Sequence, residues 1–468
     1  MKRLASLLLS LVFVASALAA DAPGVKVPAH QRFVLPNGLT VILVPRKDVP
    51  MIAFAGFVRG GSFADPDQKP GVGSLVAGLL DRGAGKRNAY EFADALEGVG
   101  GTFTAVAGTE SLSFAGQFLA RDRALMIELL ADALMRPRFE AAEFETYRAR
   151  EIEFIKAAKD SDPSQIVGIY GRAALFGSHP YGRPQGGSER SLATITREDV
   201  VTYHRENFGA DNATVVFAGD LDAKWMRQAV TTAFASWGKS SARKVKVSPA
   251  PRVTGRRVLL VDAPGSVQTY FWLGNVGVDR RYSGRPALDL VNTLYGGRFT
   301  SILNTELRIK SGLSYGASSR FSRGIMPGEF AIRSFTQTDN TVKAVDLALQ
   351  TLEQLKHGDI EQAMLESSRS YVLGQFPLQL ETAAHWASAL ADLEFYGLGK
   401  DYIEGYGPAL AKVDLAETAA VIADAFPRPT DLVIVLVGDA AKIREQVAKY
   451  GPVTEMKLSD PDFSPRAN

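Results

Sequence analysis

The sequence predicts two related α+β domains of about 200 residues each. A chain of 468 residues exceeds the size at which one hydrophobic core usually stops growing. A repeat is the second observation: ATVVFAGDLDAKWMRQ (213–228) parallels LVIVLVGDAAKIREQ (432–446) at a shift of 219 residues. LATITREDV (192–200) parallels LAKVDLAET (410–418) at a shift of 218. Two separate segments that agree on nearly one offset indicate an internal duplication.

The boundary between the two domains is predicted from composition. KSSARKVKVSPAPRVTG is rich in serine, proline and basic residues and lacks helical periodicity. It predicts a linker at 241–255, between a first domain at 27–240 and a second at 256–455. Residues 456–468 are expected to form a flexible tail.

The elements of the first domain follow from periodicity and turn signals. RFVLPNGLTVILVPRKDVPMIAFAGFVRGGSF predicts three strands with a turn at Asn37-Gly38. Helices are expected at about 70–82 and 88–98, then a hairpin in GGTFTAVAGTESLSFAGQF, then a helical zone from about 121 to 177. The repeated segment at 213–228 predicts a strand, a turn and a helix.

Charge and composition exclude some classes of function. The net charge is +2 with both signs interspersed, so no basic stripe for nucleic acid is present. The chain has no cysteine, which excludes disulfides and thiolate metal sites.

The N-terminus predicts export. Lys2 and Arg3 precede an apolar run that ends in Ala17-Leu18-Ala19, the pattern of a signal peptide at 1–20. A membrane anchor needs about 20 apolar residues, and this run is shorter. We therefore expect a soluble exported protein with no membrane span after cleavage, in the periplasm if the host is Gram-negative.

The predicted helix at 70–82 has one apolar face and one face of small residues. The apolar stripe is formed by Val72, Leu75, Val76, Leu79 and Leu80. The opposite face has few functional groups: Ser74, Ala77, Gly78 and Asp81.

Four segments, in order, resemble the insulinase-like M16 peptidase family, in particular its bacterial two-domain members. They are LPNGLTVILVP, FGSHPYGRPQGGSERSLATITREDVVTYHRENF, GGRFTSILNTELRIKSGLSYGASSRF and LADLEFYGLGKDYIEGY. The resemblance implies two duplicated α/β-roll halves, each an antiparallel sheet covered by helices. Together they would form a clamshell around a chamber for unfolded peptide.

Active members of that family carry an inverted zinc motif, His-x-x-Glu-His, on their first long helix. Two histidines one turn apart bind Zn²⁺, and the glutamate between them deprotonates the bound water. In this chain Ser74 and Gly78 stand at the histidine positions and Ala77 at the glutamate position. The resemblance therefore implies that the chain holds no zinc itself.

A second family glutamate, about 75 residues further on, should fall near Phe154 or Ile155, and a shift of one residue would reach Glu153. No replacement site is expected, because no two histidines are spaced i, i+4. The histidines are His30, His179, His204, His357 and His385.

The second domain retains an arginine–tyrosine pair of the family, Arg308 and Tyr315. Apolar spacing predicts a helix over 297–309, Gly312 is placed where a helix ends, and strand-like alternation then presents Tyr315. The resemblance implies that the pair points toward a zinc site in the opposite half and donates hydrogen bonds to the substrate carbonyl and the developing oxyanion. The alternative is a solvated helix-end arginine and an ordinary half-buried strand aromatic.

Another departure concerns the first domain. Thr104 in GGTFTA stands where active members often have asparagine, on a strand whose backbone pairs with substrate. Substrate pairing in this half is therefore in question, although a peptide can still add to a sheet edge.

Three functions remain open. The leading one is the zinc-less subunit of a heterodimeric metallopeptidase, in which a related chain with the intact motif supplies zinc and this chain supplies Arg308 and Tyr315 for hydrolysis of unfolded peptides. The second is a catalytically inert peptide-binding or scaffolding homologue. The third is a standalone peptidase with an unrecognised metal site.

Overall fold

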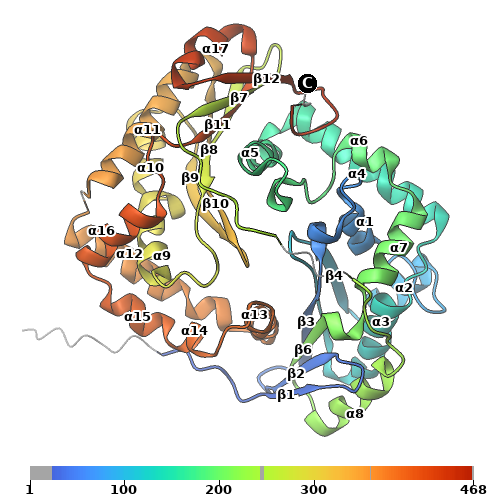
Figure 1. Cartoon of the computed structure of the whole chain (residues 1–468). Coiled ribbons are helices and arrows are strands. Elements are labelled where there is room, and N and C mark those ends of the chain that lie inside the picture. Colours follow the sequence, from blue (N-terminus) through green and yellow to red (C-terminus); the bar gives the residue numbers. More distant parts are fainter. Residues whose placement is uncertain (1–23, 243–246, 359, 466–468) are drawn as a thin grey trace, which may run out of the picture.

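The computed structural model describes residues 24–242, 247–358 and 360–465. It has two halves, each built around a six-stranded sheet with helices packed on it (Figure 1). The predicted signal peptide at 1–20 lies outside the described residues. Within the three described ranges, no helix is long and apolar enough to cross a membrane.

The described residues of the first half form six strands and eight α-helices. Its strands are β1 (Gln31–Val34), β2 (Thr40–Pro45), β3 (Met51–Arg59), β4 (Thr102–Ala107), β5 (Ser111–Leu119) and β6 (Ala213–Gly219). Its helices are α1 (Val72–Leu79), α2 (Ala89–Glu97), α3 (Arg123–Met135), α4 (Ala141–Ser161), α5 (Val167–Phe176), α6 (Glu189–Thr194), α7 (Arg197–Asn207) and α8 (Ala223–Phe234).

The second half has the same kind of composition. Its strands are β7 (Arg257–Asp262), β8 (Gln268–Val276), β9 (Ala317–Arg323), β10 (Pro327–Gln337), β11 (Val433–Gly438) and β12 (Val453–Lys457). Its helices are α9 (Arg285–Asn292), α10 (Ile302–Asn304), α11 (Thr341–His357), α12 (Gln362–Gln375), α13 (Ala383–Tyr396), α14 (Asp401–Glu404), α15 (Tyr406–Lys412), α16 (Leu415–Ala425) and α17 (Ala440–Val447).

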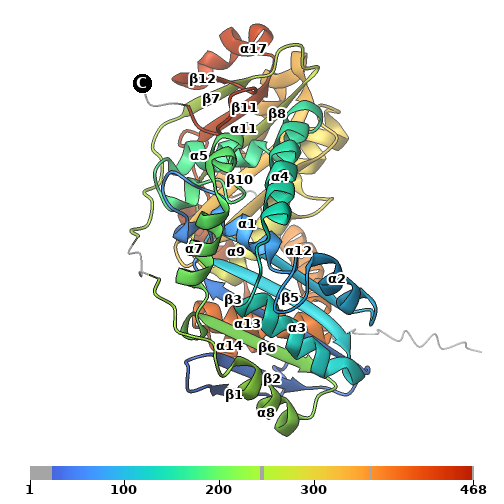
Figure 2. The same ribbon diagram turned by 90° about the vertical axis from the view of Figure 1, so that its right-hand side faces the viewer.

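The two sheets have corresponding strand orders, β1-β2-β6-β3-β5-β4 and β12-β7-β11-β8-β10-β9. Figure 2 shows β2, β6, β3 and β5 running side by side. The predicted duplication agrees with this order, because the repeated segments form β6 and β11, each the third strand of its sheet. The sheets are mixed rather than antiparallel as expected: β2 is parallel to β6, and β7 is parallel to β11. A long helical connection separates the strands of each pair and allows the chain to return in the same direction.

The predicted local elements of the first half are confirmed with sharper boundaries. Gly38 has a φ of 101°, which glycine adopts easily, in the turn between β1 and β2. Helices α1 and α2 lie where helical periodicity predicts them, and β4 and β5 form the predicted hairpin. The expected helical zone at 121–177 is divided into α3, α4 and α5, with Pro137 and Pro163 at the interruptions, since proline cannot continue a helix interior.

Each half covers one sheet face of the other half. Helix α13 from the second half packs on β3 and β6, where Trp386 and Leu390 join a buried cluster with Ile42 and Phe57. Helix α5 from the first half packs on β8 and β11 of the second sheet. This exchange explains why every residue of β6 and of β11 is buried: both strands are central and covered on both faces.

The segment after β12 returns to the first half. Phe463 is only 2% exposed, and its ring centroid lies 5.1 Å from that of Tyr170. Asp462 accepts a hydrogen bond from the Ser188 hydroxyl at 2.9 Å. Burial of this phenylalanine holds residues 458–465 in place, in contrast to the flexible tail expected from composition.

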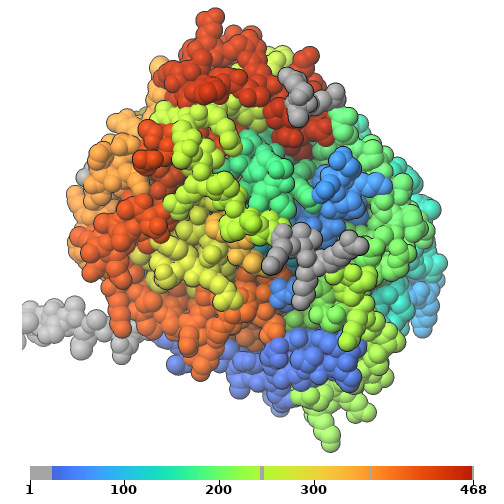
Figure 3. Space-filling model, in the orientation of Figure 1, coloured from blue at the N-terminus to red at the C-terminus, as the bar shows by residue number. Residues whose placement is uncertain are grey.

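A further contact joins the halves at the first sheet's outer edge. Arg32 of β1 pairs with Glu394 of α13 at 2.8 Å, and the Val27 amide donates to Glu404 at 3.1 Å. In the space-filling view, the orange surface of the second half meets the blue N-terminal segment along this edge (Figure 3).

Loss of the α13 contact should destabilise both halves. We expect Trp386→Ala to lower the free energy of unfolding by about 3–5 kcal/mol, because a buried indole is removed from the shared core. Urea unfolding followed by far-UV circular dichroism and tryptophan fluorescence should show one transition, shifted as a whole. Tyr90→Ala, at a residue 79% exposed on α2, is the control and should change stability little. Two separate transitions in the unaltered protein would contradict the interlocked arrangement.

Candidate functional site

Helix α1 is fixed at its first turn by a buried carboxylate. Asp65 accepts hydrogen bonds from the amides of Gly71 and Gly73 at 2.7 and 2.8 Å. Burial raises the pKa of Asp65 to about 7, although these two bonds and the charge of Arg183 act in the opposite direction. The start of α1 is therefore held by the loop that precedes it.

Ser74, Ala77 and Gly78 of α1 carry neither an imidazole nor a carboxylate, and Asp81, which follows the helix, is the one acidic residue of the predicted small-residue face. Ala77 is 4% exposed, and Ser74 and Gly78 are partly buried. Tyr147 of α4 lies directly against Gly78: a Cβ atom placed there would be 1.9 Å from the Tyr147 hydroxyl oxygen. These residues do not fit Zn²⁺, both because the ligand atoms are missing and because a tyrosine ring fills the adjacent space.

Two arginines accompany this tyrosine. The guanidinium carbons of Arg82 and Arg150 lie 5.0 and 4.5 Å from the Tyr147 ring centroid, within the range of cation–π contacts. Burial raises the pKa of the Tyr147 phenol, so the ring is a neutral group at physiological pH.

The expected second glutamate position also lacks a ligand. Phe154 is 59% exposed and Ile155 is buried, and neither side chain has a donor atom for a metal. Glu153 is exposed and pairs with Lys156 at 2.8 Å, one turn along the same helix. If the alignment is shifted by one residue, the position is Glu153, whose carboxylate is already paired with Lys156.

The histidines are dispersed. His204 is partly buried, donates from Nε2 to the Leu134 carbonyl at 3.0 Å and has its pKa lowered by desolvation to about 4. His179 accepts from the Tyr181 amide at 3.1 Å and so caps a short helical turn. The other three, His30, His357 and His385, are exposed. Across the described ranges, no group of three or more His, Asp or Glu residues could hold a metal ion.

The arginine–tyrosine pair lies in the second half, with local structure that differs from the prediction. The helix expected over 297–309 begins only at α10, because the preceding Ser301 provides the N-cap. Arg308 lies on the π-helical segment η7 (Thr305–Lys310) that continues α10. Tyr315 is in the loop before β9, not in a strand, and is 73% exposed rather than half-buried.

Arg308 contacts two exposed aromatic rings. Its guanidinium carbon lies 4.3 Å from the Tyr315 ring centroid and 4.8 Å from that of Phe299. Phe299 is 61% exposed, although its spacing predicted a place in the helix's apolar stripe. No hydrogen bond or ion pair from Arg308 to another described residue is present, so its N–H groups can donate to an outside acceptor.

The two predicted half-sites lie in different halves of the chain. Helix α1, with Ser74, Ala77 and Gly78, is in the first half, whereas α10 and the Arg308–Tyr315 pair are in the second (Figure 1). Thr104 is exposed on β4, an edge strand of the first sheet, and its hydroxyl donates to the Ala115 carbonyl at 3.3 Å.

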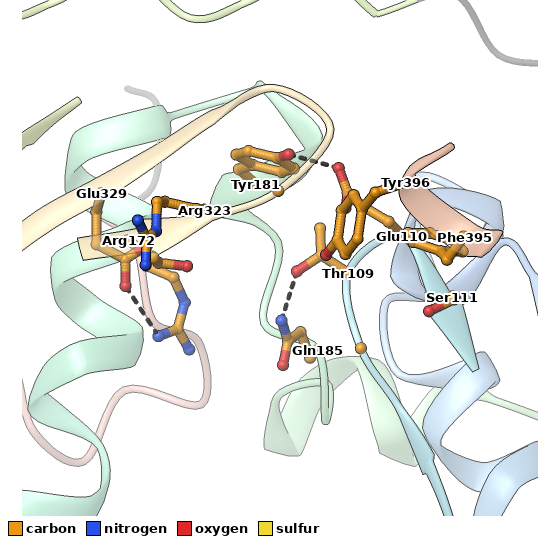
Figure 4. Close-up of a pocket in the computed structure, with 13 residues that line it drawn as sticks. Thr109, Glu110, Ser111, Arg172, Tyr181, Gln185, Arg323, Glu329, Phe395 and Tyr396 are labelled. Carbon is orange, nitrogen blue, oxygen red and sulfur yellow. Dashed lines mark hydrogen bonds and ion pairs between the residues drawn. The ribbon is translucent and has the colours of Figure 1, made fainter. Parts of the chain in front are cut away.

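A cavity of about 220 Å³ lies where the halves meet (Figure 4). The Glu110 carboxylate accepts from the Tyr181 hydroxyl at 2.6 Å and from the Ile325 amide at 2.8 Å. Arg172 faces Glu329 at 3.9 Å. Because these charges have partners across the junction and neither half-site lines the cavity, the arrangement joins the halves rather than forming a second reactive centre.

The chain is thus a duplicated α/β protein, in which each half is a six-stranded sheet with helices packed on it. Two family profiles match it: "Insulinase (Peptidase family M16)" at residues 41–187 and "Peptidase M16 inactive domain" at residues 194–371. The chain belongs to the M16 peptidase family, which confirms the resemblance read from the sequence.

Individual relatives agree with this assignment. An uncharacterized zinc protease of Mycobacterium leprae is 27% identical over 370 residues, covering 78% of this chain and 82% of its own. A peptidase M16 inactive domain from Pseudomonas fluorescens has a TM-score of 0.81 at 22% identity, covering 88% of this chain and 98% of its own. A protease from Helicobacter pylori has a TM-score of 0.79 at 22% identity, covering 88% and 100%. The two solved structures show the same fold.

Tyr147 and Phe299 are contacts that sequence reasoning missed. A tyrosine in a long amphipathic helix carries no signal that it faces a particular glycine, and an apolar residue at helical spacing predicts burial. Only the packing of α4 against α1 and the late start of α10 reveal them.

The buried Asp65 carboxylate predicts a pH dependence of stability. Its folded pKa of about 7 lies above its ordinary value of 3.8, so the folded state binds more protons than the unfolded state between these values. The free energy of unfolding therefore falls as the pH rises from about 4 to 7. We expect the difference in Tm between pH 5 and pH 8 to shrink in Asp65→Asn and to persist in Asp67→Asn, whose carboxylate is exposed. An unchanged difference in Asp65→Asn would contradict this assignment.

Proposed function

We propose that this chain is the zinc-less subunit of an exported, heterodimeric M16-type metallopeptidase that hydrolyses unfolded peptides. The observation that carries the proposal is the Arg308–Tyr315 pair: Tyr315 is exposed, and the Arg308 guanidinium has no acceptor among the described residues. The residue types on α1 also support it, because Ser74, Ala77 and Gly78 provide neither the metal ligands nor the base that such hydrolysis needs.

The proposed contribution of this chain is electrostatic. A guanidinium and a phenol donate hydrogen bonds to a peptide carbonyl, and those bonds strengthen as the oxygen gains negative charge. A related chain with an intact inverted motif would supply Zn²⁺ and the base. Tyr315 is exposed and neither residue lines the cavity between the halves, so a second chain could approach the pair from solvent.

A catalytically inert peptide-binding or scaffolding role is the alternative. The close packing of Tyr147 against Gly78 of α1 supports this alternative. Arg308 and Tyr315 affect turnover if the chain is a catalytic subunit and do not if it is a scaffold. A standalone peptidase would differ from both because it would hydrolyse peptides without a partner.

Substitution of the pair tests the proposal. This chain is purified with a related exported chain that carries His-x-x-Glu-His, and hydrolysis of a fluorogenic peptide is measured. Arg308→Ala is expected to lower kcat by about 10²–10³, the usual effect of removing one donor to an oxyanion. Tyr315→Phe is expected to lower kcat in the same direction, with assembly unchanged in size-exclusion chromatography.

Matched controls are available on the first half. Arg205 of α7 is an exposed arginine and Tyr90 of α2 is an exposed tyrosine, so Arg205→Ala and Tyr90→Phe should leave kcat unchanged. If Arg308→Ala and Tyr315→Phe also leave kcat unchanged in an intact complex, the chain is a scaffold and the proposal is wrong.

Phe299 should position the arginine. Phe299→Leu keeps an apolar side chain but removes the aromatic face beside the guanidinium. In the same complex we expect Phe299→Leu to lower kcat less than Arg308→Ala does. The double variant Phe299→Leu/Arg308→Ala should have the same kcat as Arg308→Ala alone. Phe299→Tyr should keep full activity. An additive loss in the double variant would show that Phe299 acts independently of Arg308.

A further inference from the structure

We propose that Tyr147 has replaced the metal centre on α1, so that this chain excludes Zn²⁺ even when metal ligands are restored at positions 74, 77, 78 and 154. Relatives of this chain are named as zinc proteases, whereas here the Tyr147 ring packs against Gly78 of α1. The property belongs to this chain alone and requires no partner.

The steric evidence is the position of the Tyr147 ring over Gly78. A Cβ atom at residue 78 would lie 1.9 Å from the hydroxyl oxygen, 2.1 Å from Cζ and 2.6 Å from Cε1. All three distances are shorter than real Cβ atoms show, and two of them involve ring carbons. A histidine at this position therefore requires the Tyr147 side chain to move, and not its hydroxyl group alone.

The ring is held by its neighbours. Arg82 is fixed by a hydrogen bond from its Nε to the Gly78 carbonyl at 3.1 Å and by an ion pair with Glu143 at 3.7 Å. Arg150, the other guanidinium beside the ring, pairs with Glu151 at 3.3 Å. The ring is therefore flanked by two cations that are themselves anchored.

Arg82 and Arg150, whose guanidinium groups lie beside the ring, are already paired with carboxylates. The carboxylates of Glu143 and Glu151 are engaged by these same arginines, so they are not free to serve as ligands. Restoring two histidines and two glutamates would supply ligand atoms but leave the Tyr147 ring in place.

Zinc uptake tests the proposal directly. The full chain carrying Ser74→His, Ala77→Glu, Gly78→His and Phe154→Glu is compared with the same chain that also carries Tyr147→Ala. Each is loaded with zinc chloride, dialysed against zinc-free buffer and analysed for zinc per chain, with circular dichroism to confirm folding. We expect the four-substitution chain to retain less than about one tenth of a zinc ion per chain. The chain that also carries Tyr147→Ala should retain about one zinc ion per chain.

Two outcomes would overturn the proposal. One is stoichiometric zinc in the four-substitution chain that keeps Tyr147. The other is a folded five-substitution chain that retains none, because the tyrosine would then not be the barrier.

A smaller variant set keeps the proposal testable if those chains do not fold. Gly78→Ala should lower Tm by several degrees in the unaltered chain and have little effect in a Tyr147→Ala background, where the space is open. Gly374→Ala, in helix α12 with no atom within 4 Å of the added methyl group, is the control and should not lower Tm. Equal losses for Gly78→Ala in both backgrounds would show that Tyr147 does not occupy this space and would contradict the proposal.

Discussion

The first sheet has apolar side chains on both of its faces, and its own half covers only one of them. The second face is buried by α13, which carries Trp386 and Leu390 and belongs to the other half of the chain. The second sheet has the converse relationship with α5, where Gly171 lacks a side chain and lets Trp272 pack closely: a Cβ there would be 2.4 Å from the indole ring. This reciprocal burial places the halves against each other, and the other junction contacts, including Glu110 with the Ile325 amide, depend on it.

Much of the architecture could be predicted from the sequence because it depends on local periodicity and on the repeat. The alternation around Asn37-Gly38, the helix pattern at 70–82 and the paired segments that form β6 and β11 each report local geometry. The exchange of α5 and α13 could not be predicted in this way, since periodicity shows that a face is apolar but not which helix covers it. The direction of β2 relative to β6 is also a non-local property, and the expected antiparallel sheet was wrong for the same reason.

The candidate site shows the same division. The absence of ligands at Ser74, Ala77 and Gly78 is a statement about residue types, so it could be read directly. The burial of Phe463 and the loop position of Tyr315 depend on tertiary packing, and for both residues the structure differs from the expectation. Prediction succeeded for which chemical groups are present and failed where neighbours distant in the chain decide their surroundings.

The position of α13 has a consequence for biosynthesis. The apolar surface around Ile42, Val44 and Phe57 emerges from the ribosome early, but the helix that shields it, Ala383–Tyr396, is among the later segments to be made. Until α13 has been synthesised, this apolar sheet face has no native segment to cover it. The nascent chain is therefore expected to bind a chaperone that holds unfolded chains.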